Sequence, residues 1–70
     1  MSGPPITNQI RRLRFEHGEM TQANLAQRIG VTRQTVAAIE QGKYSPSLEA
    51  AFRIAQVFGV GIGEVFRWEG

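Results

Sequence analysis

The stretch TQANLAQRIGVTRQTVAAIEQG, residues 21–42, has the pattern of two short helices separated by a tight turn. Thr21 and Thr32 each precede a helix-length run, and a threonine hydroxyl at that position can cap the first turn. Gly30 can adopt the positive φ that the turn requires. The apolar residues expected to face inward are Leu25, Ala26, Ile29, Val31, Val36 and Ile39. Two capped helices with this stripe predict a helix-turn-helix unit.

The second helix of this unit has an outer face that no hydrophobic core requires. Arg33 and Gln34 stand in its first turn, and Ala37 and Ala38 follow. In a helix-turn-helix the second helix projects and can enter the major groove of DNA. There arginine can bond guanine, glutamine can bond adenine, and small side chains can contact thymine methyl groups. The alternative is an ordinary solvated face, but such faces usually carry Glu and Lys, which these central positions lack.

The remaining segments predict three more short helices, which makes the fold class all-α. A first helix is expected from Thr7 to about His17, a fourth from Ser47 to Gly59, and a fifth over about 62–66. Residues 66–69 alternate in polarity and could pair with residues 4–7 as two short strands. The inward residues expected for the fourth helix are Leu48, Ala51, Phe52, Ala55 and Phe58.

Composition limits the possible functions. The chain has 70 residues, enough for one domain, and no cysteine, so no disulfide supports its core. No apolar run is long enough to span a membrane, and we expect a soluble, cytoplasmic protein with a flexible segment at residues 1–5. The net charge is only +2, but seven of the eight basic residues are arginine, which suits phosphate and guanine.

The sequence offers little support for an enzyme or a cofactor site. His17 is the only histidine and there is no Asp or Cys, so neither a metal site built on paired histidines nor a catalytic triad with Asp is available. The glycines of residues 59–63 lack the spacing of a nucleotide-binding loop, and no strand is predicted before them. We therefore expect no enzymatic activity, no cofactor, no metal and no small-molecule ligand.

Residues 21–60 resemble the Cro/C1-type helix-turn-helix family of phage and bacterial repressors, and the similarity extends from about Ile6 to the end. The chain is especially similar to small stand-alone regulators that resemble the cytolysin repressor. The resemblance implies a five-helix, lambda-repressor-like DNA-binding domain over residues 6–70, with the helix-turn-helix at 21–41. Its double-stranded DNA ligand would lie against the helix that follows Gly30.

The resemblance also implies roles for individual residues. The expected base-contacting residues are Thr32, Arg33, Gln34, Ala37 and Ala38. The expected phosphate contacts are Gln22 at the start of the second helix, Lys43 and Tyr44 in the loop after the recognition helix, and Arg11 or Arg12. Arg14 and Glu40 match a pair that in this family often forms a partly buried ion pair, so a structural role is expected for both.

The C-terminal segment 60–69 is unusually apolar for the end of a small domain. Because one helix-turn-helix reads few base pairs, we expect a homodimer that presents two recognition helices about 34 Å apart to a palindromic site. The alternative is that the apolar side chains all belong to the core. Gly61 stands where relatives have a capping residue, and Gly63 weakens the helix further. The residues expected at the dimer interface are Val60, Ile62, Val65, Phe66 and Trp68.

These features predict a sequence-specific transcriptional regulator, acting as a homodimeric repressor. Two alternatives remain open at the level of sequence. One is a protein-interaction or antitoxin-like helical module that uses the same fold to hold a protein partner. The other is a restriction–modification controller, which would use the same DNA chemistry at a different promoter.

Overall fold

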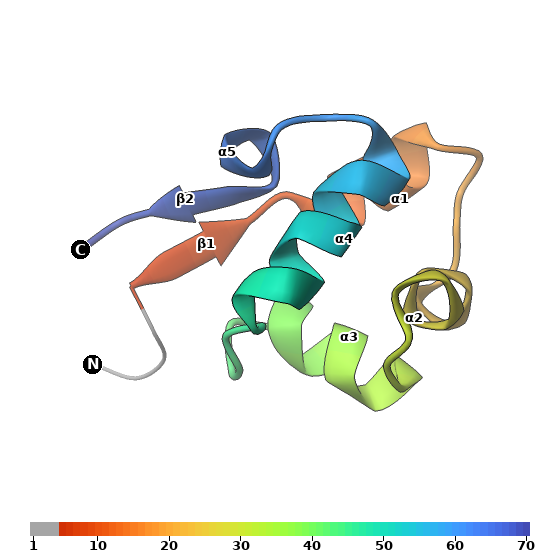
Figure 1. Cartoon of the computed structure of the whole chain (residues 1–70), viewed down its shortest axis with the longest axis horizontal. Helices are drawn as coiled ribbons and strands as arrows, with labels where there is room; N and C mark the ends of the chain where they lie inside the picture. The colour runs from red at the N-terminus through yellow and green to blue at the C-terminus, as the bar shows by residue number, and fades with distance from the viewer. Residues whose placement is uncertain (1–4) are drawn as a thin grey trace.

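The computed structural model describes residues 5–70, which form five α-helices and a two-stranded antiparallel sheet (Figure 1). In chain order the elements are β1 Ile6–Asn8, α1 Ile10–Glu16, α2 Gln22–Ile29, α3 Arg33–Glu40, α4 Leu48–Phe58, α5 Ile62–Val65 and β2 Phe66–Trp68. The expected five-helix architecture with a short pairing of the terminal segments is confirmed. Residues 1–4 of the predicted flexible segment lie outside the described residues.

The helix boundaries follow from local capping. Thr21, Thr32 and Ser47 are the N-caps of α2, α3 and α4, and each side-chain oxygen accepts a backbone N–H three residues later at 3.0–3.1 Å. Gly30 ends α2 in the left-handed region, with φ 77°, and the N–H of Val31 donates to the carbonyl of Ala26 at 3.0 Å. This turn redirects the chain into α3 and fixes the angle between the two helices.

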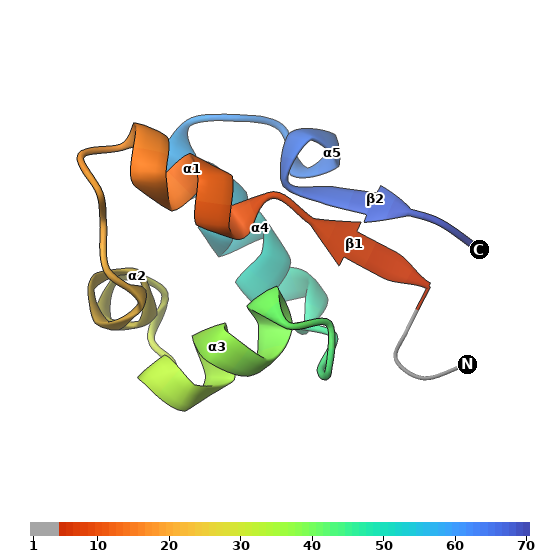
Figure 2. The same cartoon turned by 180° about the vertical axis from the view of Figure 1, so that it is seen from behind.

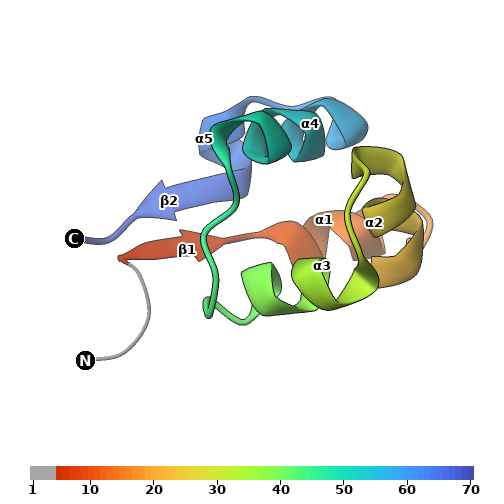
Figure 3. The ribbon, with the colours of Figure 1, turned by 60° about the horizontal axis from the view of Figure 1, so that its bottom comes forward.

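The sheet forms where sequence periodicity suggested the start of a helix. Ile6 pairs with Trp68, and Asn8 pairs with Phe66, in antiparallel register. The prediction that the first helix begins at Thr7 is wrong, because residues 6–8 are extended and α1 begins at Ile10. The expected pairing of residues 66–69 with 4–7 is correct in outline and shifted toward residues 6–8. The sheet extends away from the helices at the end of the molecule that holds the C-terminus (Figure 3).

The core lies between the helices and is continuous from α1 to α5. Its members are buried residues of all five helices: Ile10, Leu13, Leu25, Ala26, Ile29, Val36, Ile39, Ile54, Ala55, Phe58 and Val65. Met20 and Val31, which precede the caps of α2 and α3, pack against it as half-buried residues.

Two residues of α4 lie on a different face from the one predicted. Leu48 is 71% exposed and Phe52 is 54% exposed, whereas Ile54, which was not expected inside, is 1% exposed. The buried stripe of α4 is centred on residues 51, 54, 55 and 58, and one residue step turns the helix by about 100°. Phe52 follows Ala51 directly and therefore faces sideways, and Leu48 lies in the first turn beside the same exposed surface.

Candidate nucleic-acid interface

Helix α3 lies along one edge of the molecule, with α1 and α4 on its inner side (Figures 1 and 2). Val36 and Ile39, which are 1% and 2% exposed, anchor it to the core. Arg33 and Gln34 are exposed on its first turn, and neither side chain bonds to any residue among 5–70. Both side chains are therefore free to bond a ligand that approaches this edge.

The other expected base-contacting residues present small surfaces. Thr32 is exposed, but its hydroxyl accepts the N–H of Thr35 at 3.1 Å and bonds the Thr35 hydroxyl at 3.0 Å. Its methyl group is therefore the part left for a thymine contact. Ala37 and Ala38 are half-buried, so they offer only a shallow apolar surface behind the two long side chains.

The loop after α3 holds Lys43 and Tyr44 at the surface. Gly42 has φ 75°, and the N–H of Lys43 donates to the carbonyl of Ala38 at 3.0 Å, which closes the last turn of α3. Lys43 is exposed and Tyr44 is 52% exposed. The hydrogen-bonded backbone gives both side chains a fixed starting position relative to α3.

The structure distinguishes the two arginines proposed for a phosphate contact. Arg12 is tied to its own helix, since its guanidinium lies 3.1 Å from the Glu16 carboxylate and its Nε donates to the Gln9 side chain at 3.2 Å. Arg11 lines a cleft of about 350 Å³ together with Gln22. Of the two, only Arg11 shares this cleft with Gln22, another expected phosphate contact.

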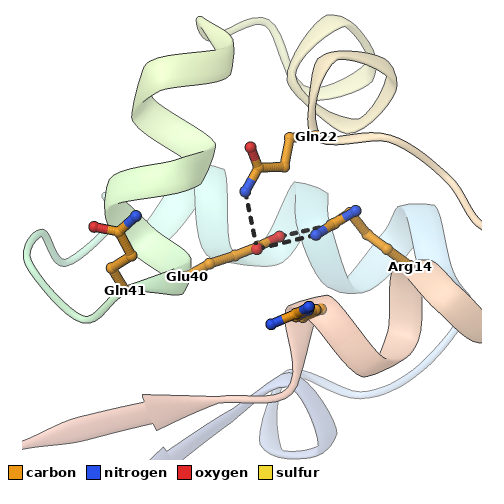
Figure 4. Close-up of a pocket in the computed structure, with 5 residues that line it drawn as sticks. Arg14, Gln22, Glu40 and Gln41 are labelled. Carbon is orange, nitrogen blue, oxygen red and sulfur yellow. Dashed lines mark hydrogen bonds and ion pairs between the residues drawn. The ribbon is translucent and has the colours of Figure 1, made fainter.

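Arg14 and Glu40 form a partly buried ion pair across the same cleft (Figure 4). The Arg14 Nε donates to Glu40 Oε2 at 2.6 Å, and its Nη2 donates to Oε1 at 3.1 Å. The side chains are 15% and 9% exposed, so the pair joins α1 to α3 largely out of water. Gln22 donates its amide N–H to Glu40 Oε1 at 3.1 Å, which brings α2 into the same network.

Asn8 is a positioning residue that sequence reasoning missed. Its amide nitrogen donates to the carbonyl of Ile39 at 3.0 Å, and its amide oxygen accepts the N–H of Ile10 at 3.1 Å. One side chain therefore gives the first N–H of α1 an acceptor that its helix lacks, and adds a second donor to the Ile39 carbonyl, which also accepts the Gly42 N–H at 3.0 Å. An Asn just before an apolar helix is a capping signal, but its link to residue 39 needed the tertiary structure.

The C-terminal residues expected at a dimer interface divide into two groups. Val65 is 0% exposed and belongs to the core, so its assignment to an interface is corrected. Val60, Ile62 and Phe66 are half-buried against the core, and Trp68 is 71% exposed. Beside them lies an open groove of about 290 Å³, lined by Ile6, Ser45, Pro46, Leu48, Ala51, Ile62 and Phe66. We call Leu48, Phe52, Trp68 and the apolar lining of this groove the apolar surface.

The basic side chains fall into two groups, those in ion pairs and those outside them. Arg12, Arg14 and Arg53 are paired with glutamates. Within residues 5–70 no ion pair involves the other five basic side chains, which are Arg11, Arg28, Arg33, Lys43 and Arg67.

Over the same residues no group of three or more His, Cys, Asp or Glu side chains could hold a metal ion. No helix of the described part is long and apolar enough to cross a bilayer.

Comparison with known proteins identifies the family. The sequence matches the helix-turn-helix family over residues 10–65. It is 50% identical to an uncharacterized HTH-type transcriptional regulator of Methanocaldococcus jannaschii, over 91% of this chain and 96% of the relative. It is 46% identical to the uncharacterized HTH-type transcriptional regulator YgzD of Bacillus subtilis, over 87% and 91%. The cryptic phage CTXphi transcriptional repressor RstR of Vibrio cholerae is 39% identical, over 86% of this chain and 53% of RstR.

Solved structures agree on the fold. A candidate DNA-binding protein from Bacteroides fragilis superposes with a TM-score of 0.75 over 89% of this chain and 98% of its own, at 21% identity, which supports the fold alone. Hydroxypropylphosphonic acid epoxidase from S. wedmorenis gives a TM-score of 0.66 at 36% identity, but the match spans only 34% of that enzyme and 86% of this chain. With its helix-turn-helix geometry and these relatives, the chain belongs to the Cro/C1-type helix-turn-helix family of transcriptional regulators.

Proposed function

We propose that the protein is a homodimeric repressor that binds a palindromic operator by placing α3 in the major groove. Arg33 and Gln34 read base edges, and the methyl groups of Thr32, Ala37 and Ala38 meet thymines or the groove wall. Residues 6–70 act as a single DNA-binding domain. The cytoplasm, where a repressor meets its promoter, is the compartment we propose.

The observation that carries this proposal is the state of Arg33 and Gln34. Both are exposed on the first turn of a helix whose opposite face is anchored in the core, and neither is bonded to a residue of the described chain. Two long polar side chains beside a shallow surface of threonine and alanine suit a groove that admits a helix. A solvated helix face would not need that combination of shape and donors.

Contacts to the DNA backbone fix the register of α3. Lys43 and Tyr44 flank its C-terminal end, while Arg11 and Gln22 lie near the cleft between α1, α2 and α3. Contacts of this kind position a protein on the duplex without reading sequence. Arg12 is the weaker candidate, because phosphate binding would compete with its ion pair to Glu16.

Dimerisation is supported by the apolar surface. Trp68 and Leu48 are each 71% exposed. Leu48 lines the mainly apolar groove, and Trp68 lines a neighbouring hollow that shares Ile62 and Phe66 with it. A contiguous exposed apolar patch on a small protein commonly marks an interface. A second copy related by a two-fold axis would cover this surface and present a second α3 to the next turn of the duplex.

The test begins with selection of a preferred duplex from a random pool, followed by binding titrations on that duplex and on a scrambled one. The proposal expects preferred binding of a palindrome, and affinity for both duplexes should fall steeply with salt as phosphate contacts release counterions. The regulator function would be excluded if neither duplex bound at about 50 mM salt, a condition that favours electrostatic binding. That outcome would favour the protein-interaction module. A restriction–modification controller would pass the same test and differ only in its promoter.

A further inference from the structure

The Glu40 carboxylate is held from two neighbouring helices. Arg14 of α1 binds both of its oxygens, at 2.6 and 3.1 Å, and the remaining Arg14 nitrogen donates to the carbonyl of Met20 at 2.8 Å. Gln22 of α2 donates to Glu40 Oε1 at 3.1 Å. With only 9% of its side chain exposed, Glu40 has little freedom to turn toward solvent. It therefore gives the Gln22 amide a fixed acceptor.

That acceptor determines which end of the Gln22 amide faces Glu40. An ionised carboxylate only accepts hydrogen bonds, so it selects the NH₂ group and turns the amide oxygen away, as Figure 4 shows. The NH₂ group carries two hydrogens, and Glu40 uses one of them. The second remains for a ligand in the cleft. Without the carboxylate, the amide could flip and present its oxygen, which cannot bond a phosphate because both are acceptors.

The surroundings of this free N–H suit a phosphate. The cleft is lined by Arg11, Arg14, Gln22, Glu40 and Gln41. The negative charge of Glu40 is balanced by Arg14, and Arg11 forms no ion pair with any residue from 5 to 70. An approaching phosphate would meet the Arg11 guanidinium and the Gln22 N–H together. Gln22 is also the first residue of α2, where unpaired backbone N–H groups favour an anion.

We propose that Glu40 is a positioning residue for DNA binding: through one hydrogen bond it orients the Gln22 amide so that an N–H is directed to a backbone phosphate. This inference rests on the proposed function and assigns Glu40 a role beyond its ion pair. The Arg14–Glu40 pair thereby joins the core of the domain to the DNA backbone through a single side chain.

The experiment is a double-mutant comparison on a random-sequence duplex, with the folded fraction of each variant measured by circular dichroism. Gln22→Ala should weaken binding about three- to tenfold, the net effect of one ordinary hydrogen bond, because water in the open cleft competes for the phosphate. It should leave the salt dependence unchanged, because glutamine displaces no counterion. In an E40Q background, Gln22→Ala should change affinity by less than about twofold. Without the Glu40 carboxylate the Gln22 amide is no longer oriented toward the phosphate, so its removal takes away little binding.

Since E40Q leaves Arg14 unpaired, a second background keeps the test valid if E40Q does not fold. The double substitution Arg14→Met with Glu40→Leu replaces the buried pair by apolar groups, an exchange that folded proteins often tolerate. Lys43→Ala is the matched control and should weaken binding by the same factor in every background. An equal loss from Gln22→Ala with and without Glu40, or no loss in the unmodified chain, overturns the positioning role alone. If the unmodified chain binds no duplex, the proposed function fails first and this inference fails with it.

Discussion

Two basic side chains near α3, Arg33 and Lys43, should have separable effects on DNA binding. Arg33 is the first residue of α3, which the proposed function places against base edges, and Lys43 lies in the loop after the helix. Arg33→Ala should reduce the preference for the selected operator over scrambled DNA by about 1–3 kcal/mol, the worth of one bidentate base contact. Lys43→Ala should weaken both duplexes alike and flatten the salt slope by about 0.9 for each protomer.

Fluorescence anisotropy with both duplexes at several salt concentrations measures these quantities. Since both side chains are exposed, unfolding by urea should show nearly unchanged stability for each variant, which serves as the control. Equal losses on operator and scrambled DNA for Arg33→Ala would exclude a base-reading role for Arg33.

The side chain of Asn8 should matter for stability far more than its place in a three-residue strand suggests. Asn8→Ala removes both bonds: the Ile10 N–H is left without a partner, and the Ile39 carbonyl keeps only the bond from the Gly42 N–H. We expect a loss of about 1–3 kcal/mol in the free energy of unfolding. The control is Thr7→Ala, whose exposed bond to Glu69 should be worth under about 0.5 kcal/mol. Urea denaturation compares the two, and equal midpoints would contradict the assignment.

At the scale of elements, the boundaries of α2, α3 and α4 could be predicted from the sequence because helix capping depends only on nearby residues. Thr21, Thr32, Ser47 and Gly30 act within a few residues of their own positions, and each behaves as its sequence context indicated. The strand β1 was only partly predictable: the alternation of residues 66–69 suggested a pairing with residues 4–7, but not its extension to Asn8. Residues 6–8 are extended because they pair with residues 66–68, and helical periodicity cannot report a partner sixty residues away.

The exposure of α4 shows a second limit of sequence patterns. Leu48 and Phe52 are apolar at helical spacing, so periodicity assigned them to the core together with Ala51 and Ala55. Which side of a broad apolar stripe is covered depends on where neighbouring helices end. Here α5 has only four residues and leaves a groove beside α4 open.

Two glycines should respond in opposite directions to the same substitution. Gly30 has φ 77°, so Gly30→Ala should destabilise by about 1–2 kcal/mol through backbone strain, although the nearest atom is 3.8 Å from the new Cβ. Gly63 lies within α5 with open space around it and no positive φ. Gly63→Ala should stabilise by about 0.5–1 kcal/mol. Thermal and urea unfolding of both variants measure the effects, and a shared sign would contradict these backbone assignments.

For the molecule as a whole, the apolar surface predicts how the proposed dimer can be disrupted. Leu48→Lys should cost an isolated protomer little, because this side chain is already 71% exposed, but it would place an unpaired charge inside a dimer contact. Sedimentation equilibrium should show a shift from dimer to monomer, with a matching loss of affinity for the full palindrome.

Phe15→Lys is the matched control for that experiment. Phe15 is 69% exposed on α1 and takes no part in lining the groove, so its replacement should leave the molar mass unchanged. A protomer that stays monomeric at concentrations that saturate the operator would contradict the dimer. So would a Leu48→Lys variant that remains dimeric.

The position of the candidate side chains on the surface was predictable from the sequence, except where it depends on contacts between elements, and their contacts with DNA stay predictions. The exposure of Arg33 and Gln34 follows from their place on a helix with a single buried stripe. The choice between Arg11 and Arg12 depends on the competing pair with Glu16, and the burial of Val65 depends on how the last helix closes the core. Neither follows from residue spacing alone.

The hydrogen-bonded group of Arg14, Glu40 and Gln22 also limits which substitutions can be tolerated at these three positions during evolution. A change at position 14 or 40 by itself would strand a charge, whereas a joint exchange for apolar residues would cost the fold little and would also free the amide at position 22. In an alignment of related proteins, positions 14, 22 and 40 should therefore co-vary, so that all three residues are kept or all three are replaced. Positions 33 and 34 should instead vary with the promoter that each relative binds.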